Sequence, residues 1–194
     1  MGHGRSASAS RTQGRPVNLA GHGTDHLDGR HDFDFILGGW KVRNRKRRDM
    51  TRLQGEDWIE FDTMALAQPI LGGLSHVDRI WSDEGSADGQ WERFTLRQFD
   101  PADRVWRIWW ASTRVPGRLG PPLTGRFAGG VGTFTGDDTI AGRSARVRFE
   151  WVNLAPGRAR WSRAFWMDAG RGWQVNWIME FTRISRRKAS DHRR

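Results

Sequence analysis

The chain has no cysteine and no tyrosine among its 194 residues, and it has no apolar run long enough to cross a bilayer. Without cysteine the protein can form no disulfide, no thiol nucleophile and no cysteine-based metal site. A membrane helix needs about 20 apolar residues in a row, and residues 1–30 also lack the apolar core of a secretory signal. We therefore expect a protein of the cytoplasm, a reducing compartment.

The sequence also lacks the short signatures of common enzyme classes. It has no P-loop, no Gly-x-Gly-x-x-Gly turn opening a helix, no nucleophile elbow and no His-Glu-x-x-His pair. The serines have no evident histidine partner, because residues 31–185 contain only His31 and His76. Asp137 and Asp138 are adjacent carboxylates that follow a glycine, which indicates a turn rather than a metal site. We expect neither a metal nor a cofactor.

The net charge of +10 suggests an acidic partner until the charges are located along the chain. Residues 1–30 contribute +2 and residues 186–194 contribute +4, which leaves +4 for residues 31–185. A domain that holds nucleic acid concentrates its basic residues on the folded surface. The distribution therefore argues against a specific nucleic-acid partner.

The chain is rich in aromatic residues, with twelve tryptophans and ten phenylalanines. From Trp40 onward, polar and apolar residues alternate with a period of two, which predicts strands. Clusters of glycine and proline separate the strands, and no segment shows the pattern of an ordinary helix. The strands are expected from Trp40 and over residues 56–67, 73–81, 91–99, 104–112, 123–128, 130–139, 144–152, 159–167 and 173–184.

Two motifs at opposite ends of this region resemble those of a known group. FDFILGGW, residues 33–40, contains a Gly-x-Trp step at the start of the first strand, and NWIMEFTR, residues 176–183, ends on an arginine. Together they resemble the calycin barrels, the lipocalin-like proteins, and an uncharacterised bacterial family of lipocalin-like domains. The resemblance implies that Trp40 closes one end of a barrel and that Arg183 packs across it.

We therefore predict an all-β fold, a single antiparallel lipocalin-like (calycin-like) β-barrel of about ten strands. The barrel is expected over residues 31–185, between a disordered basic arm, residues 1–30, and a basic tail, residues 186–194. The longest irregular segment of the barrel domain, residues 113–122, is expected at the barrel mouth or as a lid.

His76 and Asp78 form the most reactive-looking pair in the sequence. Their i, i+2 spacing places both on one face of a strand, and a neighbouring carboxylate can raise the pKa of a histidine and make it a general base. The alternative is two exposed polar residues on a solvated strand face. Glu60 and Glu180 are further acid–base candidates because they also lie in the middle of expected strands.

A second set of mid-strand residues is a candidate ligand-binding set. In a solid barrel the aromatic residues point inward and the charges face water, whereas in a hollow barrel some charges point inward as pairs. We expect an aromatic chamber with a few buried charges, drawn from Glu60, His76, Asp78, Arg97, Arg148, Asn176 and Glu180. The candidate ligand-binding residues are Arg97, Trp109, Trp110, Arg148, Glu150, Asn176 and Trp58.

Three functions remain compatible with this sequence. The first is binding of a small, largely apolar or aromatic molecule inside the barrel. The second is a cofactor-free isomerase, cyclase or hydrolase that uses buried acid and base groups on the same barrel. The third is a nucleic-acid binder, which the position of the charges argues against. No membrane partner is expected, and the sequence does not indicate the oligomeric state.

Overall fold

The computed structural model describes residues 28–49, 57–140, 142–166 and 172–184. Nearly all of the arm expected over residues 1–30, and all of the tail over 186–194, lie outside these ranges, so both remain predictions. The described residues form ten strands and two short 3₁₀ turns, η2 (Asp34–Ile36) and η3 (Leu71–Gly73). The strands are β1 (Gly38–Arg47), β2 (Trp58–Ile70), β3 (Ser75–Ser82), β4 (Trp91–Asp100), β5 (Val105–Ser112), β6 (Leu123–Ala128), β7 (Val131–Ile140), β8 (Arg143–Ala155), β9 (Arg158–Trp166) and β10 (Gln174–Arg183).

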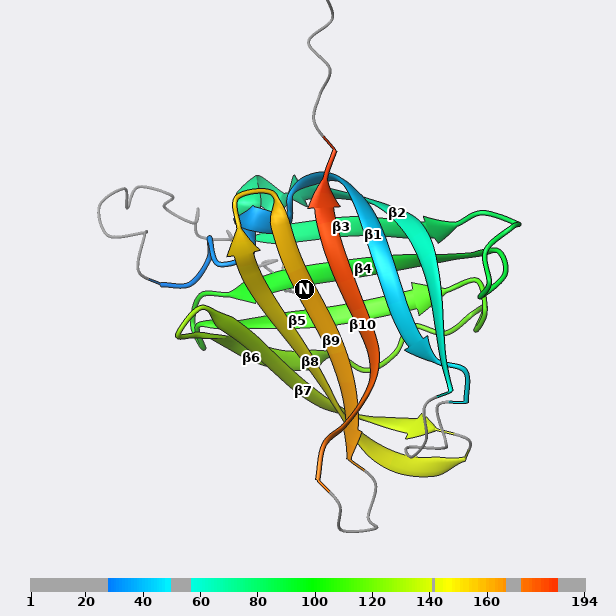
Figure 1. Cartoon of the computed structure of the whole chain (residues 1–194). Coiled ribbons are helices and arrows are strands. Elements are labelled where there is room, and N and C mark those ends of the chain that lie inside the picture. Colours follow the sequence, from blue (N-terminus) through cyan, green and yellow to red (C-terminus); the bar gives the residue numbers. More distant parts are fainter. Residues whose placement is uncertain (1–27, 50–56, 141, 167–171, 185–194) are drawn as a thin grey trace, which may run out of the picture.

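The ten strands form one closed antiparallel barrel (Figure 1). Each strand pairs with its neighbours in the sequence, and β10 returns to pair with β1, where Trp40 stands directly opposite Arg183. The predicted all-β barrel is therefore confirmed. Closure pairs the first and last strands, so neither is left as a free sheet edge of the kind that invites aggregation.

The alternation of residues determines which side chains fill the barrel. On β1, Trp40, Val42, Asn44 and Lys46 are buried, and the residues between them face outward. β8 follows the same rule, with its aromatic residues inside. Asp137 and Asp138 belong to β7, so the turn expected at them is wrong. In the described part of the chain, no helix is both long and apolar enough to cross a membrane.

The residues just before β1 close one end of the barrel. Phe33 is 0% exposed and packs edge-on against Trp106 and Trp151, with ring centroids 5.1 and 5.9 Å away. The indole N–H of Trp40 donates to Ile36 O at 2.6 Å. Arg183 lies over the Trp40 ring, with Cζ 4.2 Å from the ring centroid. The packing of Trp40 against Arg183 implied by the motif resemblance is therefore present.

The opposite end of the barrel is open next to β5. β5 and β6 pair only over Trp106–Ile108 of β5, because β6 begins after the loop of residues 113–122. That loop folds back, and the Gly120 N–H donates to Trp110 O at 3.3 Å. The second half of β5 therefore borders this loop instead of a strand.

Candidate functional site

A cavity of about 170 Å³ lies inside the barrel at the end opposite Trp40 and Arg183. Its walls come from β1, β4, β5, β8, β9 and β10 and from the two loops that follow β3 and β5. The lining residues are Lys46, Asp88, Trp91, Arg93, Trp110, Ser112, Arg114, Val115, Phe149, Arg163 and Trp177. The loop of residues 113–122 contributes two of them, which places it at the cavity mouth.

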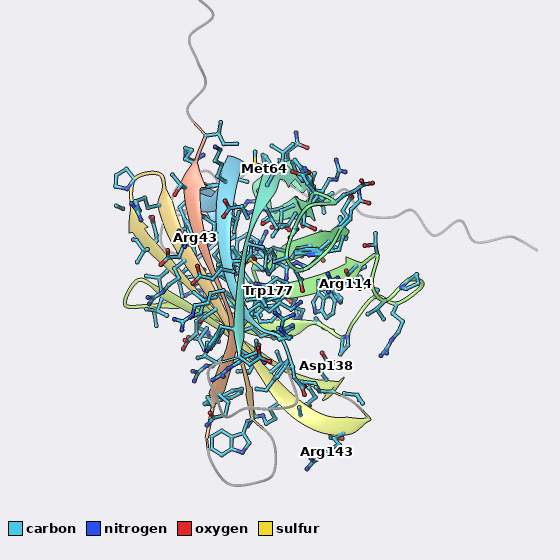
Figure 2. All side chains as sticks on the ribbon, turned by 45° about the vertical axis from the view of Figure 1, so that its right-hand side comes forward. Arg43, Met64, Arg114, Asp138, Arg143 and Trp177 are labelled. Atoms are coloured by element: carbon cyan, nitrogen blue, oxygen red, sulfur yellow. The ribbon has the colours of Figure 1, made fainter. Side chains whose placement is uncertain are left out.

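Trp177 is the centre of the cavity wall, and three cationic side chains lie over its ring. Lys46 Nζ is 4.9 Å from the ring centroid, and the Cζ atoms of Arg93 and Arg163 are 5.4 and 5.1 Å away. Figure 2 shows Trp177 in the middle of the barrel and Arg114 to one side of it. The indole N–H of Trp177 donates to the Asn44 carboxamide at 3.0 Å, which fixes the ring.

Asp88 is the only carboxylate among the residues that line this cavity. Lys46 Nζ donates to both of its oxygens, at 3.0 and 2.8 Å, and Arg114 reaches the same carboxylate at 3.3 Å. Burial lowers the pKa of Lys46, and the Asp88 carboxylate opposes that shift. Asp88 is therefore the counter-ion of both Lys46 and Arg114.

Arg93 has the least complete set of polar contacts in the cavity. Its Nε is buried and has no hydrogen-bond partner among the described residues. Its Nη2 lies 3.8 Å from the Met179 sulfur, and its Cζ lies 5.3 Å from the Trp161 ring centroid. Burial lowers the pKa of Arg93 to about 10, because removing a guanidinium from water disfavours its charge.

Arg163 lines the cavity next to Arg93 and is 9% exposed. Its Nε donates to the Asn176 carboxamide at 2.9 Å, and its Cζ lies 4.8 Å from the Phe165 ring centroid. Burial, and secondarily the positive charge of Arg93, lowers the pKa of Arg163 to about 9. The guanidinium groups of Arg93 and Arg163 therefore repel each other in the lining of the cavity.

A buried ion pair joins β3 and β4 deeper in the barrel. Arg97 Nη2 donates to Asp78 Oδ2 at 3.0 Å, and both side chains are 2% exposed. Arg97 lies over Phe33 and Trp151, with Cζ 5.1 Å from each ring centroid. Asp78 Oδ1 and Arg97 Nε and Nη1 have no hydrogen-bond partner among the described residues. The expectation that arginines meet carboxylates in the interior holds for this pair.

His76 shares the inner face of β3 with Asp78, as the spacing predicts, but the expected raised pKa is wrong. The ring is 0% exposed, and neither nitrogen has a hydrogen-bond partner in the described ranges. Burial, helped by the Arg97 charge, lowers the pKa of His76 to about 4. Asp78 faces Arg97 instead, and the carboxylate nearest to His76 Nε2 is that of Asp34, at 3.6 Å.

Glu60 and Glu180 lie on the outer face of the barrel, which corrects their expected place in the chamber. Both are exposed, and both stand beside the basic outer face of β1. Glu60 accepts a hydrogen bond from Arg43 at 2.7 Å, and Glu180 is opposite Arg43 across the β1–β10 pair. They offset positive charge at the surface, where water screens it.

The candidate ligand-binding residues divide between the two faces. Trp110 lines the cavity, and Arg97 and Asn176 are buried inside. The other four are partly exposed and share the parity of the outer faces of their strands: Trp58, Trp109, Arg148 and Glu150.

Three contacts hold three of those outer residues, Trp58, Arg148 and Glu150. Trp58 packs beneath Arg45 and Arg47, whose Cζ atoms lie 4.8 and 4.4 Å from its ring centroid. Arg148 Nε lies 3.4 Å from a Glu150 carboxylate oxygen. Arg148 was also expected in the chamber, so its outer position is a second correction.

Sequence reasoning missed all five charged residues that line the cavity: Asp88 and Arg114 on loops, and three on strands, Lys46, Arg93 and Arg163. Each of the three on strands has the same strand parity as buried aromatic or apolar residues, for example Arg93 with Trp91 on β4. A charged residue that shares a strand face with aromatic residues could therefore have indicated these positions. Arg97, four residues further along the same strand, was selected because it lies mid-strand, and Arg93 was not selected.

A larger hollow of about 750 Å³ lies at the β7–β8 hairpin, which projects from the barrel and carries Asp138 and Arg143 (Figure 2). Its lining combines Asp137, Asp138 and Arg146 with Trp166 and Trp173. Within the described ranges, no three His, Asp or Glu side chains come close enough together to hold a metal ion. The smaller cavity is the better candidate, because it lies inside the barrel and its lining includes the buried cationic side chains Lys46 and Arg163.

The fold and this cavity define a closed ten-strand antiparallel barrel with an internal, positively charged chamber, consistent with a calycin-like architecture. No family model matches the chain, and a search of curated proteins also finds no match. The functional argument therefore rests on the geometry of the cavity.

Proposed function

We propose that this protein binds a small, largely apolar or aromatic molecule inside its barrel. The observation that carries the proposal is the interior cavity with four aromatic side chains in its lining, Trp91, Trp110, Phe149 and Trp177. Binding sites for small molecules are concave and mostly apolar, with a few convergent polar groups. Small barrels are wide enough to hold one such ligand.

The cavity volume limits the size of the ligand. A cavity of about 170 Å³ is close to the engineered apolar cavity of about 150 Å³ that takes up benzene. Most pockets for drug-sized ligands are larger, at about 300–1,000 Å³. The proposed ligand is therefore a single-ring compound or a molecule of similar bulk, and not a lipid chain.

The test is to fill the cavity with a larger side chain on β5. The control is the same substitution at a neighbouring residue on the outer face of β5. Ser112→Phe places a ring in the cavity, whereas Ala111→Phe places it on the outer face of β5. Benzyl alcohol should quench or shift tryptophan fluorescence in the wild type and in Ala111→Phe, and should fail to do so in Ser112→Phe. If both variants bind benzyl alcohol equally well, the ligand does not bind in this cavity.

A second candidate is a cofactor-free isomerase, cyclase or hydrolase on the same barrel. It is favoured by Asp78 Oδ1 and the two His76 nitrogens, which are buried without partners among the described residues. Asp78→Asn should then abolish turnover of a bound compound without abolishing its binding, and Glu180→Gln on the outer face should change neither. Unchanged turnover in Asp78→Asn would remove the enzymatic alternative at this site.

The proposal keeps the cytoplasm as the compartment and includes no specific nucleic-acid partner. The support is the low charge of residues 31–185 relative to the two ends of the chain. Removing residues 1–30 and 186–194 should abolish most of any salt-sensitive binding to DNA or RNA. Tight, sequence-selective binding by the trimmed protein would overturn this part of the proposal.

A further inference from the structure

We infer that the ligand of the cavity is an anion: a single-ring aromatic carboxylate, or a carboxylate of similar bulk, whose acid group is bound by Arg93 and Arg163. This inference rests on the proposed function, since it names the chemical class of molecule that the same cavity takes. Three observations carry it: the charge balance of the lining, the contacts of Arg93, and the aromatic walls.

The lining carries an excess of positive charge. Four of its residues are cationic, Lys46, Arg93, Arg114 and Arg163, and Asp88 is the single carboxylate among them. Asp88 is already engaged by Lys46 and Arg114. An anion in the cavity would give Arg93 a counter-charge that no described residue of the lining provides.

Arg93 is the residue that most needs such an anion. Its buried Nε has no acceptor in the described part of the chain, and the Asp78 carboxylate, which favours the Arg93 charge, makes no hydrogen bond to this nitrogen. A charge removed from water is costly unless it is paired and hydrogen-bonded. The planar guanidinium presents parallel N–H groups that match the two oxygens of a carboxylate, so a carboxylate ligand supplies the missing acceptors.

The position of the two arginines on the aromatic wall selects an anion that also has an apolar body. Both guanidiniums lie over Trp177, and Trp91 packs edge-on against the same ring with centroids 5.8 Å apart. Trp110 and Phe149 complete the apolar lining. An inorganic anion would leave these aromatic surfaces without a partner, and a cation would add to the existing repulsion.

The experiment compares three compounds of one shape and different charge: benzoate, benzyl alcohol and benzylammonium. Affinity is measured by calorimetry, with tryptophan fluorescence as a second readout. Benzoate should bind the wild type at least about tenfold more tightly than benzyl alcohol, since hydrogen bonds to a charged group are stronger than those to a neutral one. Benzylammonium should bind least.

The matched variants are Arg93→Met and Arg79→Met. Arg93→Met should reduce benzoate affinity at least about tenfold and leave benzyl alcohol affinity nearly unchanged. Arg79 lies outside the barrel, paired with Glu92 at 2.5 Å, so Arg79→Met should leave both affinities unchanged. If Arg93→Met does not fold, the comparison of the three compounds on the wild type still decides the question, and Arg93→Lys tests whether charge alone suffices.

The outcomes separate this inference from the proposed function. If benzyl alcohol binds as tightly as benzoate and Ser112→Phe blocks both, the cavity binds neutral molecules and the anion inference is overturned. If inorganic phosphate displaces benzoate at equal concentration, the aromatic body is irrelevant and the inference also fails. If none of the three compounds binds, the proposed function itself fails at this site.

Discussion

Most buried polar side chains in this barrel are placed by strand parity, and the chemistry of each is then set by the few atoms around it. His76 and Asp78 could be identified from the sequence by their i, i+2 spacing, and Arg97 by its position in the middle of a strand. Their pKa values could not be predicted, because these depend on which neighbour across the strand faces each group. Asp78 meets Arg97 rather than His76, and burial dominates the pKa of His76.

The lowered pKa of His76 predicts a loss of stability on mild acidification. As the pH falls from 6.5 to about 4, His76 takes up a proton in the unfolded chain but stays neutral in the folded protein. The free energy of unfolding therefore decreases, by up to about 3 kcal/mol over this pH window. The charged groups acting on the ring are Arg97 and His31, which disfavour its protonation, and Asp34 and Asp78, which favour it.

Urea unfolding of the wild type and of His76→Gln, measured between pH 7 and pH 4.5, checks this prediction. The variant should lose clearly less stability over the window. Other carboxyl groups titrate near the lower end, so the difference between the two proteins is the informative quantity. Identical pH dependence in both would contradict the assignment of a lowered pKa to His76.

Arg93 should lower the stability of the empty protein. Its charge is held among aromatic rings with Nε unpartnered in the described residues, and replacing buried charges by apolar groups of similar size is often stabilising by about 1–4 kcal/mol. Arg93→Met should therefore raise the free energy of unfolding without ligand, by about 1 kcal/mol or more. Arg79→Met, a surface change, should stay within about 0.5 kcal/mol, and a destabilised Arg93→Met would refute the argument.

Individual strands show where reasoning from alternation succeeds and where it stops. On β8 the strict period of two holds, and Arg148 and Glu150 share the outer face opposite Phe149 and Trp151. On β10 it fails, because the pairing with β9 shifts register between Val175 and Trp177. Asn176 and Trp177 are consequently both buried, and Asn176 no longer shares a face with Glu180. A bulge of this kind leaves no reliable mark on the sequence.

The start of β1 depends on a glycine for a reason visible in its backbone. Gly38 has φ +107°, and a Cβ there would lie 2.7 Å from Arg183 Nη1. That guanidinium donates to the Leu37 and Phe35 carbonyl oxygens, which holds the residues just before β1 against β10. Residues that have a side chain rarely adopt this backbone conformation.

Gly38→Ala should therefore cost about 1–3 kcal/mol of stability, and Gly39→Ala should cost much less. Gly39 has an ordinary φ, and the nearest atom to its added Cβ would be Ile184 Cδ1 at 3.7 Å. Thermal and urea unfolding of the two variants provide the measurement. Equal losses would show that the Arg183 contact and the positive φ are not what requires glycine at this position.

At the scale of the whole molecule, the fold could be predicted, but most of the residues that line the cavity could not. Ten alternating segments and two end motifs were sufficient for a barrel, because closure brings the first and last strands together and places Trp40 opposite Arg183. The cavity depends on side chains from six strands and two loops that are far apart in the sequence. Neither their convergence nor the register shift in β10 can be read from the spacing within any one strand.

The two ends of the barrel serve different purposes in this interpretation, and one pair of variants can separate them. Trp40, 1% exposed and bonded to Ile36 O, belongs to the closed end, whereas Arg93 lines the cavity at the other. Trp40→Ala should lower the free energy of unfolding by about 3–5 kcal/mol, because it leaves a large void in a packed region. Benzoate affinity of the molecules that remain folded should change little. Arg93→Met should show the reverse, with higher stability and weaker benzoate binding. Unfolding curves and calorimetry on both variants make the comparison, and a parallel loss of stability and affinity in the two would show that the ends are one coupled unit.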